Sequence, residues 1–146
     1  MNYTLKGKHA KVSVVWNYQA PEGTGDTHYS MMRGTKANLI IRQGKEENYR
    51  PALYVKLIGS AQADLENAVK QTLQAKYPGI DLQLMPSGEY QVMIPDSYHN
   101  GHEAHFAQVT EKFLEYYKAG TMPAWEVPNM IVKYFTTTKA LEMARE

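Results

Sequence analysis

The chain has 146 residues, a formal net charge of +1 and no cysteine. Its length is that of one ordinary domain, and the lack of cysteine excludes disulfides, zinc–thiolate sites and thiol nucleophiles. No apolar run approaches the ~20 residues that span a bilayer, and the N-terminus lacks the apolar core of a signal peptide. We therefore expect a soluble chain without a membrane segment, in a compartment that the sequence leaves open.

The charges are distributed unevenly. Residues 1–58 hold nine Lys/Arg against four Asp/Glu, a balance of +5, whereas residues 59–146 hold seven against eleven, a balance of −4. A basic half can attract phosphate-bearing ligands or nucleic acid. Its positive residues are scattered singly, however, and no nucleic-acid-binding motif accompanies them, so we expect no nucleic-acid partner.

The first half of the chain has the pattern of strands. In residues 8–19 the side chains alternate with a period of two, which predicts one long strand with a buried face. Three further strands are predicted at 27–32, 37–43 and 52–59. The turn before the strand at 37–43 contains Gly34, which we expect to supply a positive φ angle. The predicted inward side chains are Val12, Val14, Trp16, Tyr18, Ala37, Leu39, Ile41, Leu53, Val55 and Leu57.

From Ser60 the apolar spacing becomes helical. Ser60 is a suitable N-cap, and the helix is predicted to run until a Pro-Gly pair stops it. A second hairpin follows around the turn PSGE. Two helices close the chain, one from about 101 to 118 and one from about 128 to 143. The inner face of the last helix is predicted to consist of Met130, Ile131, Tyr134, Phe135 and Leu141.

The resulting order β-β-β-β-α-β-β-α-α predicts a single α+β domain over residues 1–146. We expect an open, mainly antiparallel sheet with helices packed on one face. The other face mixes apolar and polar side chains, which suits a protein interface or a cleft better than bare solvent. We therefore expect a homo-oligomer through this sheet face. Its predicted members include Ser13, Val15, Asn17, Tyr54 and Ile58.

The motif HNGHEAH, residues 99–105, holds three of the five histidines. Asn100 and Glu103 have the spacing of a capping box, which predicts a helix start. His102 and His105 each precede an apolar residue by one turn, so we expect both to face inward or into a cleft. Three interpretations stay open: structural histidines, a substrate-facing cleft, and a metal site, whose HExxH spacing is not matched.

The stretch GTGD, residues 23–26, offers the first two glycines of a dinucleotide fingerprint. His28 stands where the third glycine belongs, and a strand follows instead of a helix, so the stretch predicts a connecting loop. Such loops often carry ligand contacts, which makes Asp26, His28 and Tyr29 candidates for the rim of a cleft. No nucleophile elbow, Walker loop or Ser-His-Asp order is present, and no catalytic residue is assigned.

Residues 16–44, WNYQAPEGTGDTHYSMMRGTKANLIIRQG, resemble the C-terminal domain of oxidoreductases in the glucose-fructose oxidoreductase / inositol dehydrogenase / MocA family. The segment RGTKANLII is similar to the G-T-K-G-x-L hairpin of that family, with Ala37 in place of its second glycine. Residues 101–120 and 123–141 resemble the same domains, so the likeness spans most of the chain.

The resemblance implies a two-domain parent in which an N-terminal Rossmann domain binds NAD or NADP. The C-terminal domain then shapes the pocket for a sugar or polyol and often forms the oligomer interface. This chain contains neither the Rossmann fingerprint nor the family's Glu-Lys-Pro motif. We therefore expect a C-terminal domain without its Rossmann partner, which binds no cofactor itself and is not catalytic alone.

The candidates for the substrate cleft are expected to form hydrogen bonds to a ligand, with no acid or base role assigned. They are Asp26, His28, Tyr29, Arg33, His99, His102, Glu103 and His105. The competing hypotheses are a stand-alone module that binds a protein or a ligand without enzymatic activity, and a histidine-based metalloenzyme.

Overall fold

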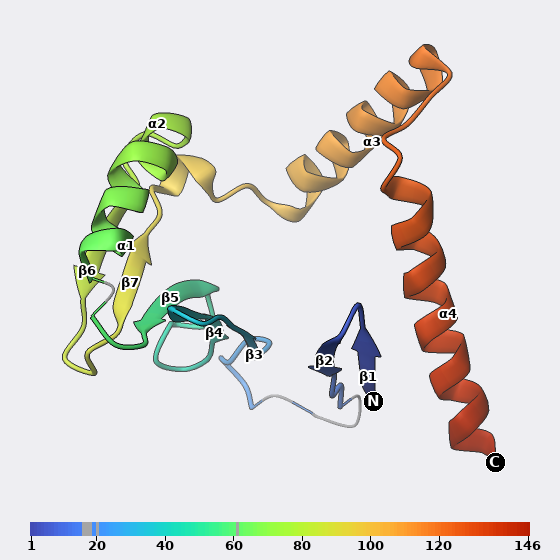
Figure 1. The fold of residues 1–146 in the computed structure, drawn as a ribbon, viewed down its shortest axis with the longest axis horizontal. Coiled ribbons are helices and arrows are strands. Elements are labelled where there is room, and N and C mark those ends of the chain that lie inside the picture. Colours follow the sequence, from blue (N-terminus) through green and yellow to red (C-terminus); the bar gives the residue numbers. More distant parts are fainter. Residues whose placement is uncertain (16–18, 20, 61) are drawn as a thin grey trace. The chain divides into compact units, whose positions relative to one another are not determined.

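The computed structural model of the chain describes residues 1–15, 19, 21–60 and 62–146. These fall into two compact units, one formed by residues 19–99 and one by residues 1–18 with 100–146 (Figure 1). The elements confirm the predicted α+β class with a mainly antiparallel open sheet. None of the helices in the described ranges is long and apolar enough to cross a membrane.

The unit of residues 19–99 is built on a five-stranded sheet in which every neighbouring pair is antiparallel. In spatial order the strands are β3 (His28–Arg33), β4 (Ala37–Gln43), β5 (Ala52–Leu57), β7 (Tyr90–Met93) and β6 (Asp81–Leu84). The three strands predicted between 27 and 59 are confirmed, and so is the hairpin around PSGE, where Gly88 has a φ of 79°.

One face of this sheet is covered by a helical segment made of α1 (Gln62–Ala68), the π-helical turn η1 (Val69–Leu73) and α2 (Gln74–Lys76). The predicted N-cap Ser60 adjoins residue 61, which lies outside the described residues. The core between helix and sheet consists of Val55, Val69, Ile80, Tyr90 and Val92. Leu53, Leu57 and Ala37 pack against it, as the alternation in their strands predicts.

The opposite face carries no helix of this unit and is called the open face below. The register Met31↔Ile40↔Tyr54 places these three side chains on it, since directly paired residues share a face. Its members on the first three strands are Tyr29, Met31, Arg33, Asn38, Ile40, Arg42, Tyr54 and Lys56. This face mixes polar and apolar groups as predicted, and Tyr54, one of its predicted members, lies on it.

Gly34 is needed in the β3–β4 turn for a reason other than the predicted one. Its φ angle is not positive, so the expectation of a left-handed glycine was wrong. Its N–H instead donates to the Ala37 carbonyl oxygen at 2.9 Å, and a Cβ atom on Gly34 would lie 2.8 Å from that oxygen. The close approach of the backbone therefore excludes a side chain here.

The other unit begins with a hairpin that the sequence did not predict correctly. Strands β1 (Asn2–Leu5) and β2 (Lys8–Lys11) pair around Lys6 and Gly7, whose φ angles of 47° and 73° are typical of a tight hairpin turn. The predicted long strand over 8–19 is wrong, because β2 ends at Lys11 and residues 12–15 are not strand. The partner β1 is only four residues long, and Val12 exchanges two backbone hydrogen bonds of 2.8 Å with Met1, at the very start of the chain, so that β1 has no residue left to pair with Val14. The calls on Trp16, Asn17 and Tyr18 lie outside the described residues.

The chain ends with two long helices, α3 (His102–Ala119) and α4 (Glu126–Arg145), preceded by the short turn η2 (Asp96–Tyr98). Helix α3 ends where predicted, at Gly120 with a φ of 64°. Its N-cap is Gly101 without a side-chain hydrogen bond, so the predicted capping box of Asn100 and Glu103 is wrong. Pro128 lies in the first turn of α4, as predicted.

Neither long helix contains a buried residue. On α3 the aromatic and apolar stripe of Phe106, Val109, Phe113 and Tyr117 is 62–77% exposed. The predicted inner face of α4 is likewise 45–67% exposed, so no residue of its own unit buries it. The spacing identified the apolar side of each helix, and this unit supplies no surface that covers it.

Candidate functional site

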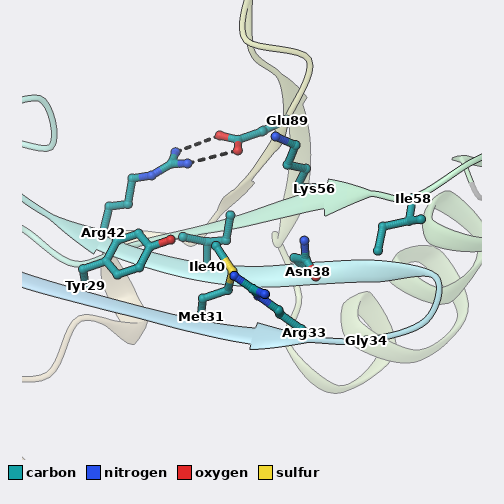
Figure 2. A pocket seen from close by; sticks show the side chains of 10 residues that line it. All are labelled: Tyr29, Met31, Arg33, Gly34, Asn38, Ile40, Arg42, Lys56, Ile58 and Glu89. Carbon is teal, nitrogen blue, oxygen red and sulfur yellow. Dashed lines mark hydrogen bonds and ion pairs between the residues drawn. The ribbon is translucent and has the colours of Figure 1, made fainter. Parts of the chain in front are cut away.

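The open face of the five-stranded sheet contains a pocket of about 520 Å³ (Figure 2). Its volume is within the range of ~300–1,000 Å³ that small-molecule sites occupy. Ile40, which is 1% exposed, forms the floor. The lining consists of Tyr29, Met31, Arg33, Gly34, Asn38, Ile40, Arg42, Lys56, Ile58 and Glu89.

Strand pairing puts these side chains in rows across the sheet. Arg33 on β3 lies opposite Asn38 on β4, which lies opposite Lys56 on β5. In the next rows Met31 lies opposite Ile40, and Tyr29 lies opposite Arg42. Because every second residue of a strand faces the same side, the pocket runs along β4, with polar groups at both ends and apolar ones in the middle.

Arg42 and Glu89 form a bidentate ion pair at one wall of the pocket. The guanidinium nitrogens Nη1 and Nη2 donate to the two carboxylate oxygens at 2.8 and 3.0 Å. The Glu89 side chain is 8% exposed and that of Arg42 is 31% exposed. The hydrogen bonds from Arg42 lower the pKa of Glu89 against the opposing effect of burial, and those to Glu89 raise the pKa of Arg42. Glu89 is therefore an ionised acceptor at neutral pH.

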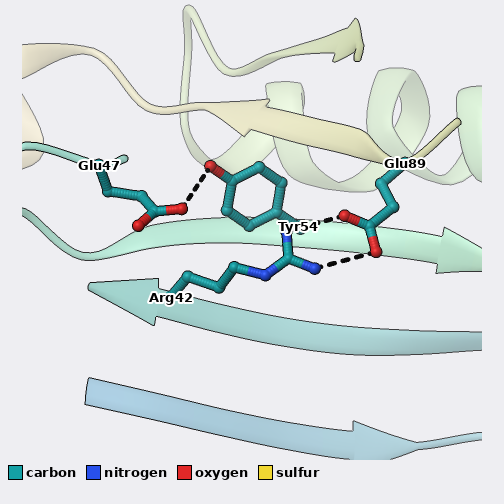
Figure 3. Close-up of polar contacts among 4 residues, drawn as sticks. All are labelled: Arg42, Glu47, Tyr54 and Glu89. Atoms are coloured by element: carbon teal, nitrogen blue, oxygen red, sulfur yellow. Dashed lines mark hydrogen bonds and ion pairs between the residues drawn. The ribbon is translucent and has the colours of Figure 1, made fainter. Parts of the chain in front are cut away.

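The ion pair is part of a larger network on the open face (Figure 3). The Arg42 guanidinium lies 4.6 Å from the ring centroid of Tyr54, and the Tyr54 hydroxyl donates to Glu47 at 3.2 Å. Glu47 also accepts the Gly44 N–H at 3.1 Å. Burial, reinforced by the Glu47 carboxylate, raises the pKa of Tyr54. The network holds the loop after β4 against the sheet and fixes the orientation of Arg42.

This arrangement is suited to non-covalent binding. Arg33, Arg42 and Lys56 bring three positive charges to the lining against the single negative charge of Glu89. Asn38 adds an amide that can donate and accept, and the floor is apolar. Such a combination can orient a ligand that carries several hydrogen-bonding groups.

The structure places the candidates near the GTGD loop on different sides of the sheet. Tyr29 and Arg33 line the pocket, whereas neighbouring His28 pairs with Gln43 and so faces the opposite side. Asp26 lies outside the pocket, where its backbone carbonyl accepts a hydrogen bond from the Gln43 side chain at 3.1 Å. The strand register thus separates residues that are adjacent in sequence.

The HNGHEAH candidates do not line this pocket. His99 follows η2 and is exposed. His102, Glu103 and His105 lie in the first turn of α3, and all three are exposed, so the histidines are not buried and their place in a cleft stays a prediction. His102 stacks on Phe106 with 6.5 Å between ring centroids, as its helical spacing predicts. In the part of the chain that the structure describes, no three His, Cys, Asp or Glu residues form a possible metal site.

The four polar or charged lining residues that the sequence did not identify are Asn38, Arg42, Lys56 and Glu89. The first three could have been found, because they alternate with Leu39, Ile41, Val55 and Leu57, which the pattern assigned to the opposite face. Glu89 could not, since its role depends on how β7 pairs with β5, some 35 residues earlier in the chain.

The GTGD stretch does not have the surroundings of a Rossmann-type dinucleotide site. Gly23, with a φ of 76°, belongs to a loop that leads into β3, and β3 pairs with β4 in an antiparallel hairpin. Dinucleotide binding at a glycine-rich turn requires a following helix whose N-terminus faces the pyrophosphate. We therefore assign no cofactor chemistry to these residues.

Comparison with known proteins agrees with this architecture. Residues 1–145 match the family described as "Putative oxidoreductase C terminal domain". The crystal structure of a protein from Parabacteroides merdae, described as a putative oxidoreductase, is 53% identical in sequence. The match has a TM-score of 0.91 and covers 99% of this chain but 34% of that one, so this chain spans about a third of its length. No curated protein matches. The chain therefore belongs to the family of oxidoreductase C-terminal domains.

Proposed function

We propose that this chain is the substrate-binding and assembly domain of a nicotinamide-dependent oxidoreductase of the glucose-fructose oxidoreductase / inositol dehydrogenase / MocA family. In this proposal the longer enzyme acts on a sugar or polyol, and a separate N-terminal Rossmann domain binds NAD or NADP. The observation that carries the proposal is the pocket on the open face of the sheet.

The lining of that pocket matches the chemistry of a polyhydroxylated ligand. Each hydroxyl group both donates and accepts, so a polyol requires donors and acceptors close together. Arg33, Asn38 and Lys56 supply donors, and the ionised Glu89 supplies acceptor lone pairs. The C–H faces of a sugar ring pack well on aromatic rings, and Tyr29 is 62% exposed at the rim.

The same residues favour binding over catalysis by this chain alone. Hydride transfer needs a nicotinamide, and the GTGD stretch, which leads into a β-hairpin, does not have the helix that a Rossmann-type dinucleotide site requires. Glu89 is held ionised by Arg42, so it is a poor proton donor at neutral pH. The proposal therefore gives this domain the task of holding and orienting the substrate.

Calorimetric titration of the 146-residue chain tests the proposal, with NAD, NADP and a panel of neutral sugars and polyols up to millimolar concentration. We expect weak binding of at least one sugar or polyol and none of either dinucleotide. Tyr29→Ala should weaken sugar binding, whereas Tyr117→Ala removes a ring that is 77% exposed on α3, outside the pocket, and should not. Dinucleotide binding, or sugar binding unaffected by Tyr29→Ala, would contradict the proposal.

A second role, in assembly, is supported by the long helices. The stripe on α3 exposes four large side chains in a continuous row, and Phe113 stacks on Tyr117 with 6.3 Å between centroids. Apolar patches of this kind on a water-soluble domain usually mark an interface. The sequence predicted a homo-oligomer through the open sheet face; we place the contact on α3 and α4 instead, because the large uncovered apolar rows lie there.

Light scattering at increasing concentration tests this second role. We expect association of the unmodified chain and a monomer for Phe113→Glu. Gln108→Glu adds the same charge on the other side of α3 and should leave association intact. A chain that stays monomeric at high concentration would contradict assembly through these helices.

A further inference from the structure

One end of the open-face pocket carries two cations, Arg33 and Lys56, and neither lies within ion-pair distance of a carboxylate among the described residues. Arg33, Asn38 and Lys56 occupy directly opposed positions on three adjacent strands, so each is ~5 Å from the next along the row. Arg33 and Lys56 are thus attached on either side of Asn38, and in Figure 2 the Arg33 side chain extends toward Met31 while the Lys56 ammonium group lies on the side of Glu89.

Two other cations of this unit form ion pairs with carboxylates. Lys36 forms an ion pair with Asp64 at 3.0 Å, and Arg42 forms the bidentate pair with Glu89. Among the described residues, neither Arg33 nor Lys56 takes part in an ion pair. The Arg33 Nε atom has only the Met31 sulfur, a weak acceptor, at 3.5 Å.

Arg42 also determines where an anion could bind. By engaging both oxygens of Glu89, it neutralises the one carboxylate of the lining. Lys56 also attracts the Glu89 carboxylate at longer range, but three cations against one carboxylate leave the lining with a net positive charge for a ligand, together with the amide N–H groups of Asn38. The remaining lining, from Ile40 to Tyr29, is apolar and aromatic and carries no further charge.

Building on the proposed function, we propose that the pocket selects an anionic sugar. The carboxylate or phosphate group binds over Asn38 between Arg33 and Lys56, and the hydroxyl-bearing body lies along Ile40 toward Tyr29 and Glu89. The shared chemistry is an oxyanion attached to a polyol. A guanidinium recognises such an oxyanion through planar, charge-assisted hydrogen bonds, and an ammonium group adds a point charge.

The test compares calorimetric titrations of the 146-residue chain at low salt with glucose, glucuronate, glucose 6-phosphate and inorganic phosphate. We expect at least one anionic sugar to bind about tenfold more tightly than glucose, the gain of one charge-assisted contact. Preference for glucuronate or for glucose 6-phosphate then distinguishes a carboxylate from a phosphate ligand. Added salt should reduce the preference, because it screens exposed charges.

Variants of the two cations locate the site. Arg33→Gln and Lys56→Gln should each lower the ratio of the affinity for the anionic sugar to the affinity for glucose, because Gln keeps a hydrogen-bond donor for a hydroxyl group but removes the positive charge. Both residues are exposed, so folding should be retained, which circular dichroism verifies. Lys45→Gln and Arg50→Gln remove equal charges from exposed positions outside the pocket and should leave the preference unchanged.

The remaining outcomes separate this inference from the function on which it rests. If glucose binds as tightly as both anionic sugars, the anion site is overturned and the sugar pocket stands. If inorganic phosphate binds as tightly as the sugar phosphate, the contact is general attraction to positive charge, and the inference is overturned. If no sugar of either charge binds, both this inference and the proposed sugar-binding function are overturned.

Discussion

The five-stranded sheet unit and the two long helices use the same kind of apolar periodicity with opposite results. In the sheet unit, alternate residues of β5 and β7 meet the helical segment and are buried, with Val55 at 4% exposure. On α3 an equally regular stripe leaves Phe113 at 62% exposure. Periodicity therefore identifies the side of an element that requires a partner, but it does not reveal whether that partner belongs to the same chain.

This difference concerns stability as well as geometry. Burial of apolar side chains is the main favourable term in folding, and the described helices α3 and α4 contribute little to it in the isolated chain. The sheet unit also contains a polar network in which Arg42 donates hydrogen bonds to Glu89 and Tyr54 donates one to Glu47. We therefore expect substitutions in the sheet unit to affect the stability of the chain, and those on the helices to affect association.

The largest effect is expected when one apolar side chain is shortened to alanine in each of the two regions. Ile80→Ala removes a core side chain that is 8% exposed, and should lower the free energy of unfolding by about 2–5 kcal/mol. Phe113→Ala removes a larger side chain from the exposed stripe, and should change it by less than about 0.5 kcal/mol at a concentration where the chain is monomeric. Urea denaturation of both variants measures the difference. Equal losses would show that α3 is already covered within the chain.

The next effect concerns the Arg42–Glu89 ion pair. Arg42→Ala leaves a largely buried carboxylate without its donors, and should cost about 1–3 kcal/mol of unfolding free energy. Lys36→Ala breaks an ion pair in which both side chains are at least 65% exposed, and should cost less than about 1 kcal/mol. Chemical denaturation at neutral pH compares the two. A negligible loss for Arg42→Ala would mean that water satisfies Glu89 in its place.

The same ion pair predicts a dependence of stability on pH. The folded-state pKa of Glu89 is lowered, chiefly by hydrogen bonds from Arg42, so its contribution is fully present above the unfolded-state value of about 4.5. That contribution is lost as the pH falls through the lower folded-state pKa. Denaturation midpoints between pH 7 and pH 3 should thus fall less for Glu89→Gln than for the unmodified chain. Parallel curves would contradict a linked proton at Glu89.

Sequence patterns predicted the elements whose partners are local. Leu53, Val55 and Leu57 were assigned to the buried face, and Gly120 to the end of α3, because alternation and a left-handed glycine are properties of a few consecutive residues. The strand predicted over 8–19 failed, because its length depends on a partner strand, and β1 supplies only four residues. Strand pairing over long distances in sequence is not encoded in the pattern of one segment.

The candidate site was predictable only in part for the same reason. Tyr29 and Arg33 were named from a loop and a hairpin, yet His28 was included beside them although the register turns it to the opposite face. The histidines of α3 were assigned an inward orientation because they precede an apolar stripe, and that stripe is exposed. Asn38, Lys56 and Glu89 form the site only after β3, β4, β5 and β7 are aligned in space.

The smallest expected effect sharpens the description of α3 by comparing its two ends. Gly120 ends the helix at a φ of 64°, where a side chain is strained even though no atom lies within 4 Å of its Cβ position. Gly120→Ala should cost about 1 kcal/mol locally and expose the amides of the last turn to faster hydrogen exchange.

Gly101, the N-cap, has an ordinary φ of −69°, and its Cβ would make a normal contact 3.7 Å from Glu103. Gly101→Ala should therefore cost only a few tenths of a kcal/mol, since glycine is a weaker cap than Ser or Asn. Because α3 contains no buried residue and belongs to another compact unit than β5, both effects should stay within the helix and leave the exchange of β5 amides unchanged. A change in β5 upon Gly120→Ala would instead reveal coupling between the exposed helix and the sheet core.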